Sequence, residues 1–227
     1  MFYGDNTNVP FVYLDPSGKP SGIVIDLLNQ IEKKIPYTFS YELLPWKRAY
    51  RSAESGNGAI IGVSKNSKRL KIFDYTDVLY YHDIVLVVLK GNEFVFNKIE
   101  DLKGKRVAVP RGSKYSDDYV KALSDGLFEA VKTDSREQRL KLLLRGRIDV
   151  ALIGGGKAGV KLSISQLPEL IENRKRFVTL GTPLLRDANF IAFNKGLEAT
   201  GFIQKYNQAL KQSLKNGTYQ QIMQSYE

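Results

Sequence analysis

The pattern of hydrophobic and polar positions switches between helical and strand spacing along most of the chain. In residues 22–35, apolar side chains recur every three to four positions, which predicts an amphipathic helix. Residues 37–44 alternate aromatic or leucine side chains with smaller or polar ones, which predicts a strand. A helix over 46–55 and a buried strand over 59–63 follow. This alternation favours a wound α/β layer with a parallel sheet.

The middle of the chain repeats the alternation, with predicted strands at 106–110 and 148–153 and predicted helices at 116–123 and 136–145. Two extended segments, 84–90 and 189–194, could join two units, and a final helix is expected over 201–215. We therefore expect two α/β lobes. Lobe 1 is discontinuous, from residues 1–88 and 190–227, and lobe 2 is inserted as residues 89–189.

Composition narrows the class of protein. The 227 residues are 43% hydrophobic and 26% charged, which is globular, and the longest apolar run, 84–89, is far shorter than the roughly 20 residues of a membrane-spanning helix. The chain has no cysteine and one histidine, His82, so disulfides, thiolate nucleophiles and histidine-rich metal sites are excluded, and we expect no cofactor. Met1 is followed by a turn-like polar stretch at Asp5 without a signal-peptide pattern, as in a cytoplasmic protein or an exported one whose signal is removed.

The formal net charge of +10 is concentrated in the middle of the chain. Residues 89–189 hold 20 basic and 13 acidic side chains, a net charge of +7. The basic residues are spread out and alternate with acids, which is typical of solvated helix faces. No Walker lysine pattern, GxGxxG after a strand or aromatic RNA-binding box is present, so a nucleic acid is not an expected partner.

Several segments, taken in order and with their spacing, resemble a known family. They are residues 9–13 (VPFVY), 22–27 (GIVIDL), 62–69 (GVSKNSKR), 74–76 (DYT), 80–81 (YY), 101–109 (DLKGKRVAV), 112–113 (GS), 146–151 (GRIDVA) and 214–222 (LKNGTYQQI). The chain is similar over nearly its whole length to the bacterial extracellular solute-binding proteins of family 3, the periplasmic amino-acid-binding components of ABC transporters.

The resemblance implies the two-lobed type II fold of periplasmic binding proteins, with a ligand cleft between lobes that close by hinge motion. It also implies a monomer in the periplasm, a small-molecule ligand such as an amino acid or related carboxylate, and a membrane ABC permease as partner.

The resemblance assigns residues of lobe 1 to the ligand. Arg69 stands where the family's carboxylate-binding arginine stands, and a guanidinium supplies the planar, paired donors that a carboxylate needs. Ser64 occupies the position of a ligand-contacting hydroxyl, and Gly62 would let backbone amides approach the ligand. Aromatic candidates for the cleft walls are Trp46, Tyr13 and Tyr80. Ordinary packing is the alternative for each aromatic, and a solvated surface side chain is the alternative for Arg69.

In lobe 2, Gly112, Ser113 and Lys114 open a predicted helix, where backbone N–H groups and a hydroxyl form an anion seat. The alternative for Ser113 is a plain helix cap. Gly154, within a triple glycine, stands where relatives that bind α-amino acids carry an aspartate for the ligand's ammonium group. The triple glycine is either a loop whose backbone closely contacts the ligand or a flexible turn.

The missing aspartate leaves three explanations open. Another carboxylate, Asp5 or Asp187, meets the ammonium group; neutral acceptors and water meet it; or the ligand has none. Asn8 replaces an aromatic of many relatives, which points away from the basic-amino-acid binders. With Arg111, Lys114 and Lys157 expected near the cleft, we expect a ligand at least as anionic as a neutral zwitterion.

Two other functions fit the same resemblance. Cyclohexadienyl dehydratases are similar to this family, and proton transfer in such an enzyme would need a side chain such as His82 or Glu137. The chain could also be a sensory ligand-binding module of a larger receptor. Neither His82 nor Glu137 lies in a catalytic sequence motif, so we expect a binding protein rather than an enzyme.

Overall fold

The structure is a computed structural model that describes residues 1–111, 113 and 115–226. They divide into two compact units: unit 1 comprises Met1–Tyr81 and the chain from Asp187 onward, and unit 2 comprises His82–Arg186. The lobe limits expected at 88/89 and 189/190 fall inside strands β8 (Tyr80–Leu89) and β13 (Leu185–Asn194), each of which has residues in both units. Hydrophobic spacing identifies such strands, but it does not mark the residue at which their packing partners change.

Unit 1 is built on a sheet with three parallel strands. β1 (Phe2–Asp5) lies between β5 (Tyr41–Leu44) and β6 (Ala59–Val63) and is parallel to both. β13 pairs antiparallel with β6, and β7 (Phe73–Tyr75) pairs antiparallel with β13. The expectation of a polar turn at Asp5 is therefore wrong, because Phe2 and Tyr3 are buried in this sheet and Asp5 is the last residue of β1.

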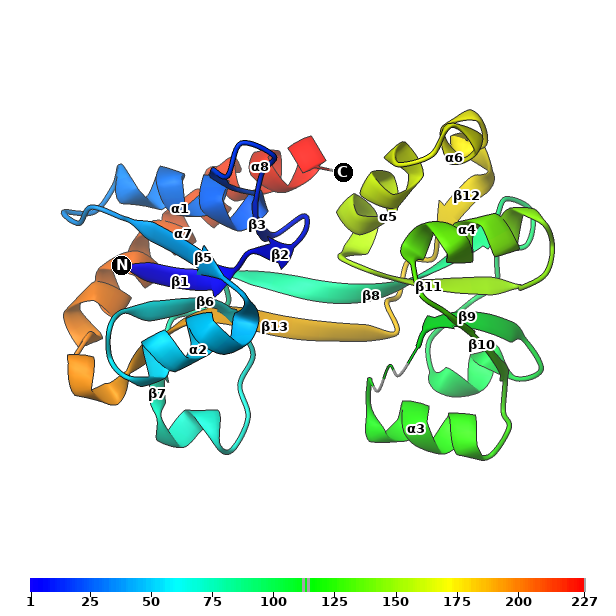
Figure 1. The fold of residues 1–227 in the computed structure, drawn as a ribbon, viewed down its shortest axis with the longest axis horizontal. Coiled ribbons are helices and arrows are strands. Elements are labelled where there is room, and N and C mark those ends of the chain that lie inside the picture. The colour runs from blue at the N-terminus through cyan, green and yellow to red at the C-terminus, as the bar shows by residue number, and fades with distance from the viewer. Residues whose placement is uncertain (112, 114, 227) are drawn as a thin grey trace. The chain divides into compact units, whose positions relative to one another are not determined.

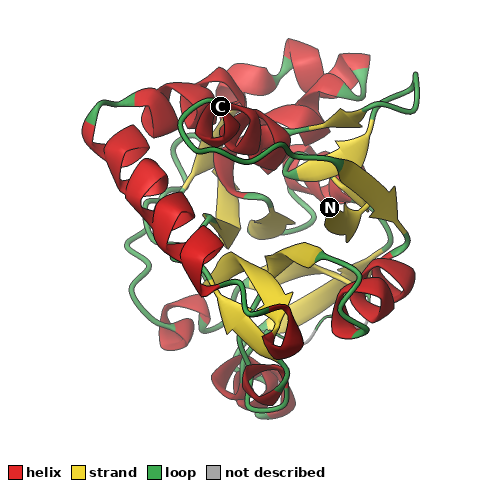
Figure 2. Cartoon of the chain, turned by 90° about the vertical axis from the view of Figure 1, so that its left-hand side faces the viewer, coloured by secondary structure: helices red, strands yellow, loops and turns green. Residues whose placement is uncertain are grey.

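Helices cover the sheet of unit 1 (Figure 2), and they are α1 (Ile23–Glu32), α2 (Trp46–Glu54), α7 (Thr200–Lys215) and α8 (Thr218–Tyr226). The predicted helix at 22–35 is confirmed, since Ile23, Leu27 and Ile31 are at most 2% exposed and form its buried face. A small antiparallel sheet of β2 (Thr7–Asn8), β3 (Val12–Leu14) and β4 (Pro20–Ser21) completes the unit.

The strand predicted over 37–44 begins only at Tyr41. The rings of Tyr37 and Phe39 pack instead against Phe202 of α7, with centroids 5.1 and 6.0 Å apart. The aromatic alternation before Tyr41 therefore reflects packing against a helix, a use of apolar side chains that period-2 spacing cannot separate from strand pairing.

Unit 2 repeats the strand order of unit 1 (Figure 1). β9 (Arg106–Pro110) lies between β10 (Glu129–Thr133) and β11 (Val150–Gly154) and is parallel to both. β8 pairs antiparallel with β11, and β12 (Phe177–Thr179) pairs antiparallel with β8. The helices are α3 (Asp117–Ser124), α4 (Arg136–Leu144), α5 (Gly156–Ser165) and α6 (Pro168–Glu172).

Two hydrophobic clusters flank the sheet of unit 2, one that includes Leu86, Val107 and Tyr119 and another that includes Val87, Ala108 and Leu140. Successive residues of β8 and β9 thus point into different clusters, as expected for a strand buried on both faces. The sheet is therefore a rigid platform for the loops that follow its strands.

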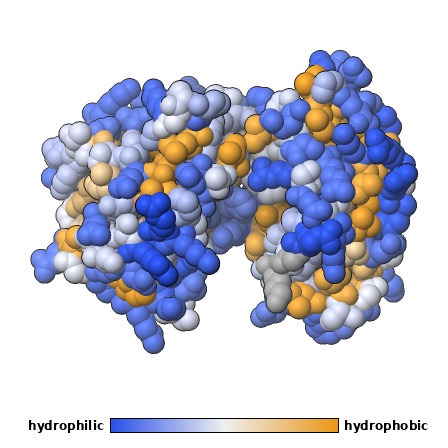
Figure 3. Space-filling model, viewed as in Figure 1, coloured by the Kyte–Doolittle hydropathy of each residue, from blue (hydrophilic) through white to orange (hydrophobic). Residues whose placement is uncertain are grey.

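The matching topology predicts where each unit can carry a site. In an α/β sheet, ligands bind outside the carboxyl ends of the parallel strands. The relevant residues follow β1, β5 and β6 in unit 1 and β9, β10 and β11 in unit 2. In the described part of the chain no helix is long and apolar enough to span a membrane. On the face shown in Figure 3, hydrophobic residues are scattered among hydrophilic ones.

Candidate functional site

Arg69 and Ser64 meet in the loop that follows β6. Arg69 is the first residue of a 3-10 helix, Arg69–Lys71, and its backbone N–H donates to Asn66 Oδ1 at 2.9 Å. Its guanidinium Nη1 donates to the backbone oxygen of Ser64 at 3.0 Å and to Ser64 Oγ at 3.1 Å. Ser64 and Arg69, which are five positions apart in the sequence, are thus in direct contact. These hydrogen bonds hold the guanidinium in one orientation.

Aromatic rings lie beside this guanidinium. The Cζ atom of Arg69 is 6.0 Å from the ring centroid of Trp46 and 5.5 Å from that of Tyr50, both on α2. Within the described residues Arg69 has no ion pair, and its side chain is half-buried. A partly desolvated arginine that is held by aromatic faces and forms no ion pair in the described residues is suited to an incoming carboxylate.

A hollow of about 360 Å³ adjoins Arg69 within unit 1, and it is lined by Trp46, Lys47, Tyr50, Arg51, Glu54, Asn66, Lys68 and Arg69. Four of these side chains are basic and one is acidic. Tyr50 was not among the residues expected from the sequence, although it lies one helical turn after Trp46 and so shares its face of α2.

A second group of candidates converges on the hydroxyl of Tyr80. Asn8 Nδ2 donates to Tyr80 Oη at 3.3 Å. A methyl group at Gly62 would lie 2.9 Å from the same oxygen, and Gly62 has φ of +75°, so both the space and the backbone favour glycine. The ring of Phe11 stacks on Tyr80 at 4.3 Å, which fixes the phenol in place.

Asp5 and Asp187 also lie near this hydroxyl. Burial of Tyr80 raises the pKa of its phenol well above the ordinary value, the Asn8 hydrogen bond lowers it, and the charges of Asp187 and Asp5 raise it further. Asp5 is held by Thr7, whose N–H and Oγ1 both donate to Asp5 Oδ1 at 2.8 Å. Two carboxylates expected from distant parts of the sequence therefore occur together in unit 1, at the end of β1 and the start of the unit 1 segment of β13.

Tyr13 lies apart from both groups. It belongs to β3. Burial and the contact with Asp26 raise the pKa of the Tyr226 phenol of α8, and Tyr13 makes the smallest contribution to that rise. Among the described residues no contact joins Tyr13 to Arg69 or to Tyr80. Its expected role as a wall of the ligand site thus finds no support in local contacts.

In unit 2, Gly154 is the last residue of β11. A methyl group there would lie 3.3 Å from His82 Cε1 and 3.4 Å from Ile84 Cδ1. Gly155, with φ of +92°, caps α5, so the triple glycine forms the turn from β11 into this helix. The helix itself was not expected, because a glycine run carries no helix signal.

The other unit 2 candidates lie at neighbouring strand ends. Arg111 follows β9, and its Nε is 2.8 Å from Asp134 Oδ1, although both side chains are well exposed. Burial raises the pKa values of the Tyr115 and Tyr119 phenols, and the nearby Ser113 lowers both, although Tyr119 Oη has no hydrogen-bond partner in the described residues. Lys157 is exposed on the first turn of α5, and Lys114 lies outside the described residues.

Two arginines of α4, Arg136 and Arg139, were not expected to be buried, because the basic residues of 136–147 are typical of a solvated helix face. Arg139 is only 4% exposed, and its Nη1 donates to Thr133 Oγ1 at 2.9 Å. Arg136 is half-buried. Burial lowers the pKa of both guanidinium groups. Arg139 lies four residues before the buried Leu143 and so shares its face of α4, which is the signal that could have revealed the buried position.

No group of three or more histidine, aspartate or glutamate side chains suited to a metal ion is present in the described residues. The arrangement instead offers one oriented guanidinium, two carboxylates near a buried phenol, and several cations at strand ends. Such groups are suited to a small charged molecule.

Comparison with known proteins identifies the class that this two-unit fold and these charged groups define. The chain matches the model of the bacterial extracellular solute-binding proteins, family 3, over residues 2–227. The chain therefore belongs to this family, and the family and type II binding-protein fold expected from the sequence are confirmed.

The chain is 24% identical to the L-cystine-binding protein TcyJ of Escherichia coli (strain K12), over 98% of this chain and 80% of that protein. It is 25% identical to the histidine-binding periplasmic protein of the same strain, over 98% and 85%. Among solved structures, the second substrate-binding domain of a putative amino acid ABC transporter from Streptococcus pneumoniae Canada MDR_19A matches with a TM-score of 0.77 and 24% identity, over 99% of this chain and 98% of that chain. The two relatives from Escherichia coli are named as binding proteins, and the solved structure is a substrate-binding domain.

Proposed function

We propose that this chain captures a small molecule with a carboxylate, an α-amino acid or a close relative of one, and delivers it to an ABC transporter. The observation that carries the proposal is Arg69, whose guanidinium is oriented by Ser64 and flanked by Trp46 and Tyr50 without an acid to neutralise it in the described residues. The named relatives bind L-cystine and histidine. Because those ligands share only the α-amino acid group, the proposal extends to that group alone.

The proposal assigns the ligand's ammonium group to unit 1. Asp5 and Asp187 both act on the hydroxyl of Tyr80, and Asn8 donates to the same atom. Of the three explanations for Gly154, this convergence favours another carboxylate. An ammonium group near the two carboxylates would have both charge compensation and hydrogen-bond acceptors, whereas the Tyr80 phenol is only 1% exposed.

The remaining parts of the proposal follow from the family. The protein acts as a monomer in the periplasm after removal of an export signal, without a cofactor, and its partner is a membrane permease. Ser113, Lys114 and Gly154 of unit 2 are assigned to the ligand by the same family resemblance. No catalytic step is assigned to His82 or Glu137, because the relatives are binding proteins.

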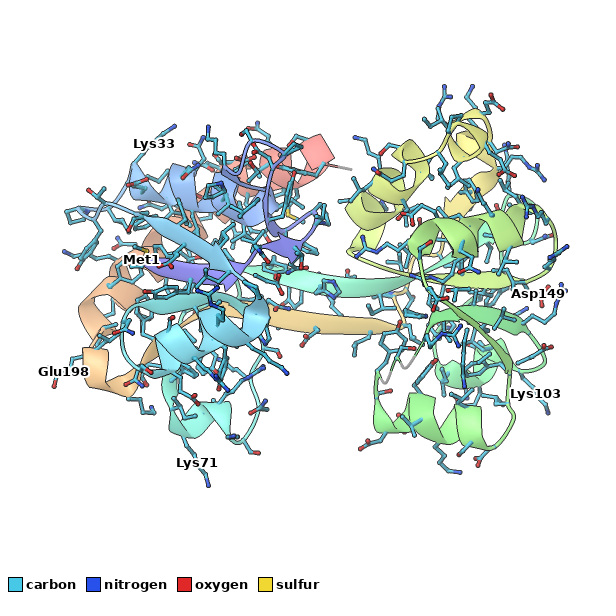
Figure 4. All side chains as sticks on the ribbon, viewed as in Figure 1. Met1, Lys33, Lys71, Lys103, Asp149 and Glu198 are labelled. Atoms are coloured by element: carbon cyan, nitrogen blue, oxygen red, sulfur yellow. The ribbon has the colours of Figure 1, made fainter. Side chains whose placement is uncertain are left out.

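The test is a thermal-shift panel of amino acids and small organic acids on the full chain. A ligand at 100 times its Kd should raise Tm by about 5–10 °C for a protein of this size. Arg69→Gln should abolish the shift. The control is Lys71→Gln, which removes a cation from the same 3-10 helix at an exposed position that points away from the ribbon (Figure 4) and should keep the shift. An unchanged shift in Arg69→Gln, or no shift with any compound, would contradict the proposal.

A further inference from the structure

Two arginines of unit 2 lie close together on α4, and one of them extends to α5 of the same unit. Arg136 is the first residue of α4, and Arg139 follows it by three positions and so lies on the same side of the helix. A methyl group at Gly159 of α5 would lie 3.8 Å from Arg136 Nη1. The Arg136 guanidinium therefore lies beside the amino-terminal part of α5.

Both guanidinium groups are shielded from water. Arg139 is 4% exposed, and Arg136 is half-buried. Burial lowers the pKa of both side chains, and the positive charge of Arg136 lowers the pKa of Arg139 further. Two like charges that solvent screens poorly repel each other, so an anion beside this pair would be strongly favoured.

The side chains around the pair satisfy only part of its hydrogen bonding. Arg139 Nη1 donates to Thr133 Oγ1 at 2.9 Å, but the buried Nε of Arg139 has no partner in the described residues. Arg136 forms no hydrogen bond or ion pair through its side chain in the same part of the chain. A neutral acceptor such as the Thr133 hydroxyl can satisfy an N–H group, but it cannot balance the charge of a desolvated guanidinium.

The acids near the start of α4 do not bind the pair. Asp134 is bound to Arg111 at 2.8 Å. The charge of Glu137 raises the pKa of both arginines, which partly opposes the effect of burial, but Glu137 forms no ion pair with either one within the described residues. The charge of Arg136 and Arg139 is thus available to an anion from outside the chain.

The amino ends of the two helices differ in a way that favours the same anion. In α4, Ser135 Oγ accepts a hydrogen bond from the backbone N–H of Gln138 at 3.1 Å and so caps the helix. In α5, the capping position is Gly155, which has φ of +92° and no side chain, and no side-chain hydrogen bond caps this helix in the described residues. The first N–H groups of α5 and the positive end of its dipole are therefore open to an anion near Arg136.

We propose that unit 2 by itself holds a small inorganic oxyanion, of the phosphate or sulfate type, at Arg136 and the amino end of α5. Arg136 supplies planar, paired donors to the oxygens, and Arg139 adds a second positive charge. Backbone N–H groups of α5 supply further donors. The site goes beyond the proposed function, because all of its groups belong to unit 2 and none of them depends on an amino acid at Arg69.

The test measures Tm of the full chain in Tris chloride without amino acids, with sodium phosphate or sodium sulfate replacing chloride at constant ionic strength. At 100 times its Kd, an oxyanion should raise Tm by about 5–10 °C, and the rise should saturate. Arg136→Gln should remove the saturable rise and leave only the general salt effect, which does not saturate. Arg136→Lys keeps the charge without the paired donors and should need about tenfold more oxyanion for the same rise.

Two matched variants locate the anion. Arg147→Gln removes an exposed cation just after α4, and Arg69→Gln removes the guanidinium of unit 1, so both should keep the saturable rise. The inference is wrong if neither oxyanion gives a saturable rise, or if Arg136→Gln keeps the rise while Arg69→Gln loses it. The amino-acid panel tests the proposed function separately, so either one can fail alone. The Tm of each variant in chloride shows whether the substitution has changed the fold, and Arg136→Lys then provides the decisive comparison.

Discussion

The two units place different chemistry at equivalent positions of one topology. Each unit has three parallel strands, β1, β5 and β6 in unit 1 and β9, β10 and β11 in unit 2. The first of the three lies between the other two, and a helix follows the second. The first residue of that helix is Trp46 in unit 1 and Arg136 in unit 2. The central strand ends at Asp5 in unit 1, whereas Arg111 follows the central strand of unit 2.

The comparison shows that topology sets where a site can form and that side-chain charge sets what it recognises. The edge of unit 1 combines one arginine with Asp5 and Asp187, which suits a zwitterionic group. At the edge of unit 2, Arg136 and Arg139 form no ion pair within the described residues, which suits an anion. Within unit 2, Asp149 lies at the amino end of β11 (Figure 4), at the end of the strand remote from Gly154.

The largest expected effect tests the acids of unit 1. The double variant Asp5→Asn and Asp187→Asn should bind an α-amino acid about 100-fold more weakly, or about 2.7 kcal/mol, because the ammonium group loses its charge partners. The same acid without its amino group should lose less than about threefold. Isothermal titration with both compounds measures the difference, and the two single variants serve as controls. Equal losses for both compounds would assign Asp5 and Asp187 a structural role only.

A smaller effect tests the buried cation of unit 2. Arg139→Met should raise the free energy of unfolding of the ligand-free protein by about 1–3 kcal/mol, because it removes a buried charge that no carboxylate pairs. The comparison variant, Arg69→Met in unit 1, should change stability by less than about 0.5 kcal/mol, since Arg69 is only half-buried. Urea unfolding provides both values. A loss of stability in Arg139→Met would mean that unit 2 itself stabilises this cation.

The smallest expected effect concerns the free energy of unfolding and the ion pair between Asp149 and Arg106 of unit 2. Asp149 accepts hydrogen bonds from the backbone N–H of Arg106 at 2.7 Å and from its guanidinium at 2.8 and 3.3 Å, and the Arg106 hydrogen bonds lower the pKa of Asp149. Because both side chains are 41% exposed, solvent screens the pair, and Asp149→Asn should cost about 1 kcal/mol at pH 7.

The pH dependence of this effect follows from the lowered pKa. The contribution of Asp149 is complete above its unfolded pKa of about 3.9 and is lost as the pH falls through the lower folded pKa. The stabilities of the wild type and Asp149→Asn should therefore converge as the pH falls below the lowered folded pKa, as measured by urea unfolding at several pH values. Glu172→Gln, at an exposed residue, is the control and should show no such change. A difference that stays constant with pH would rule out the ion pair as its source.

Local patterns predicted much of the fold. The strands at 59–63 and 106–110 have the expected bounds, and the helix predicted over 136–145 ends one residue early. β10 and α5 were missed because the first is a short strand with charged residues and the second begins in a glycine run. Arg69 and Ser64 could be paired from the sequence because five residues separate them and the family resemblance covers both.

The sequence by itself determined the family, the alternation of strands and helices, and the residues that a short loop brings together. The tertiary structure decided the rest. Asp5, Asn8, Gly62 and Asp187 come together only at the Tyr80 hydroxyl, because four distant segments meet there. The burial of Arg139 likewise depends on the packing of α4 against the sheet, which removes a cation from water whatever its neighbours in the sequence are.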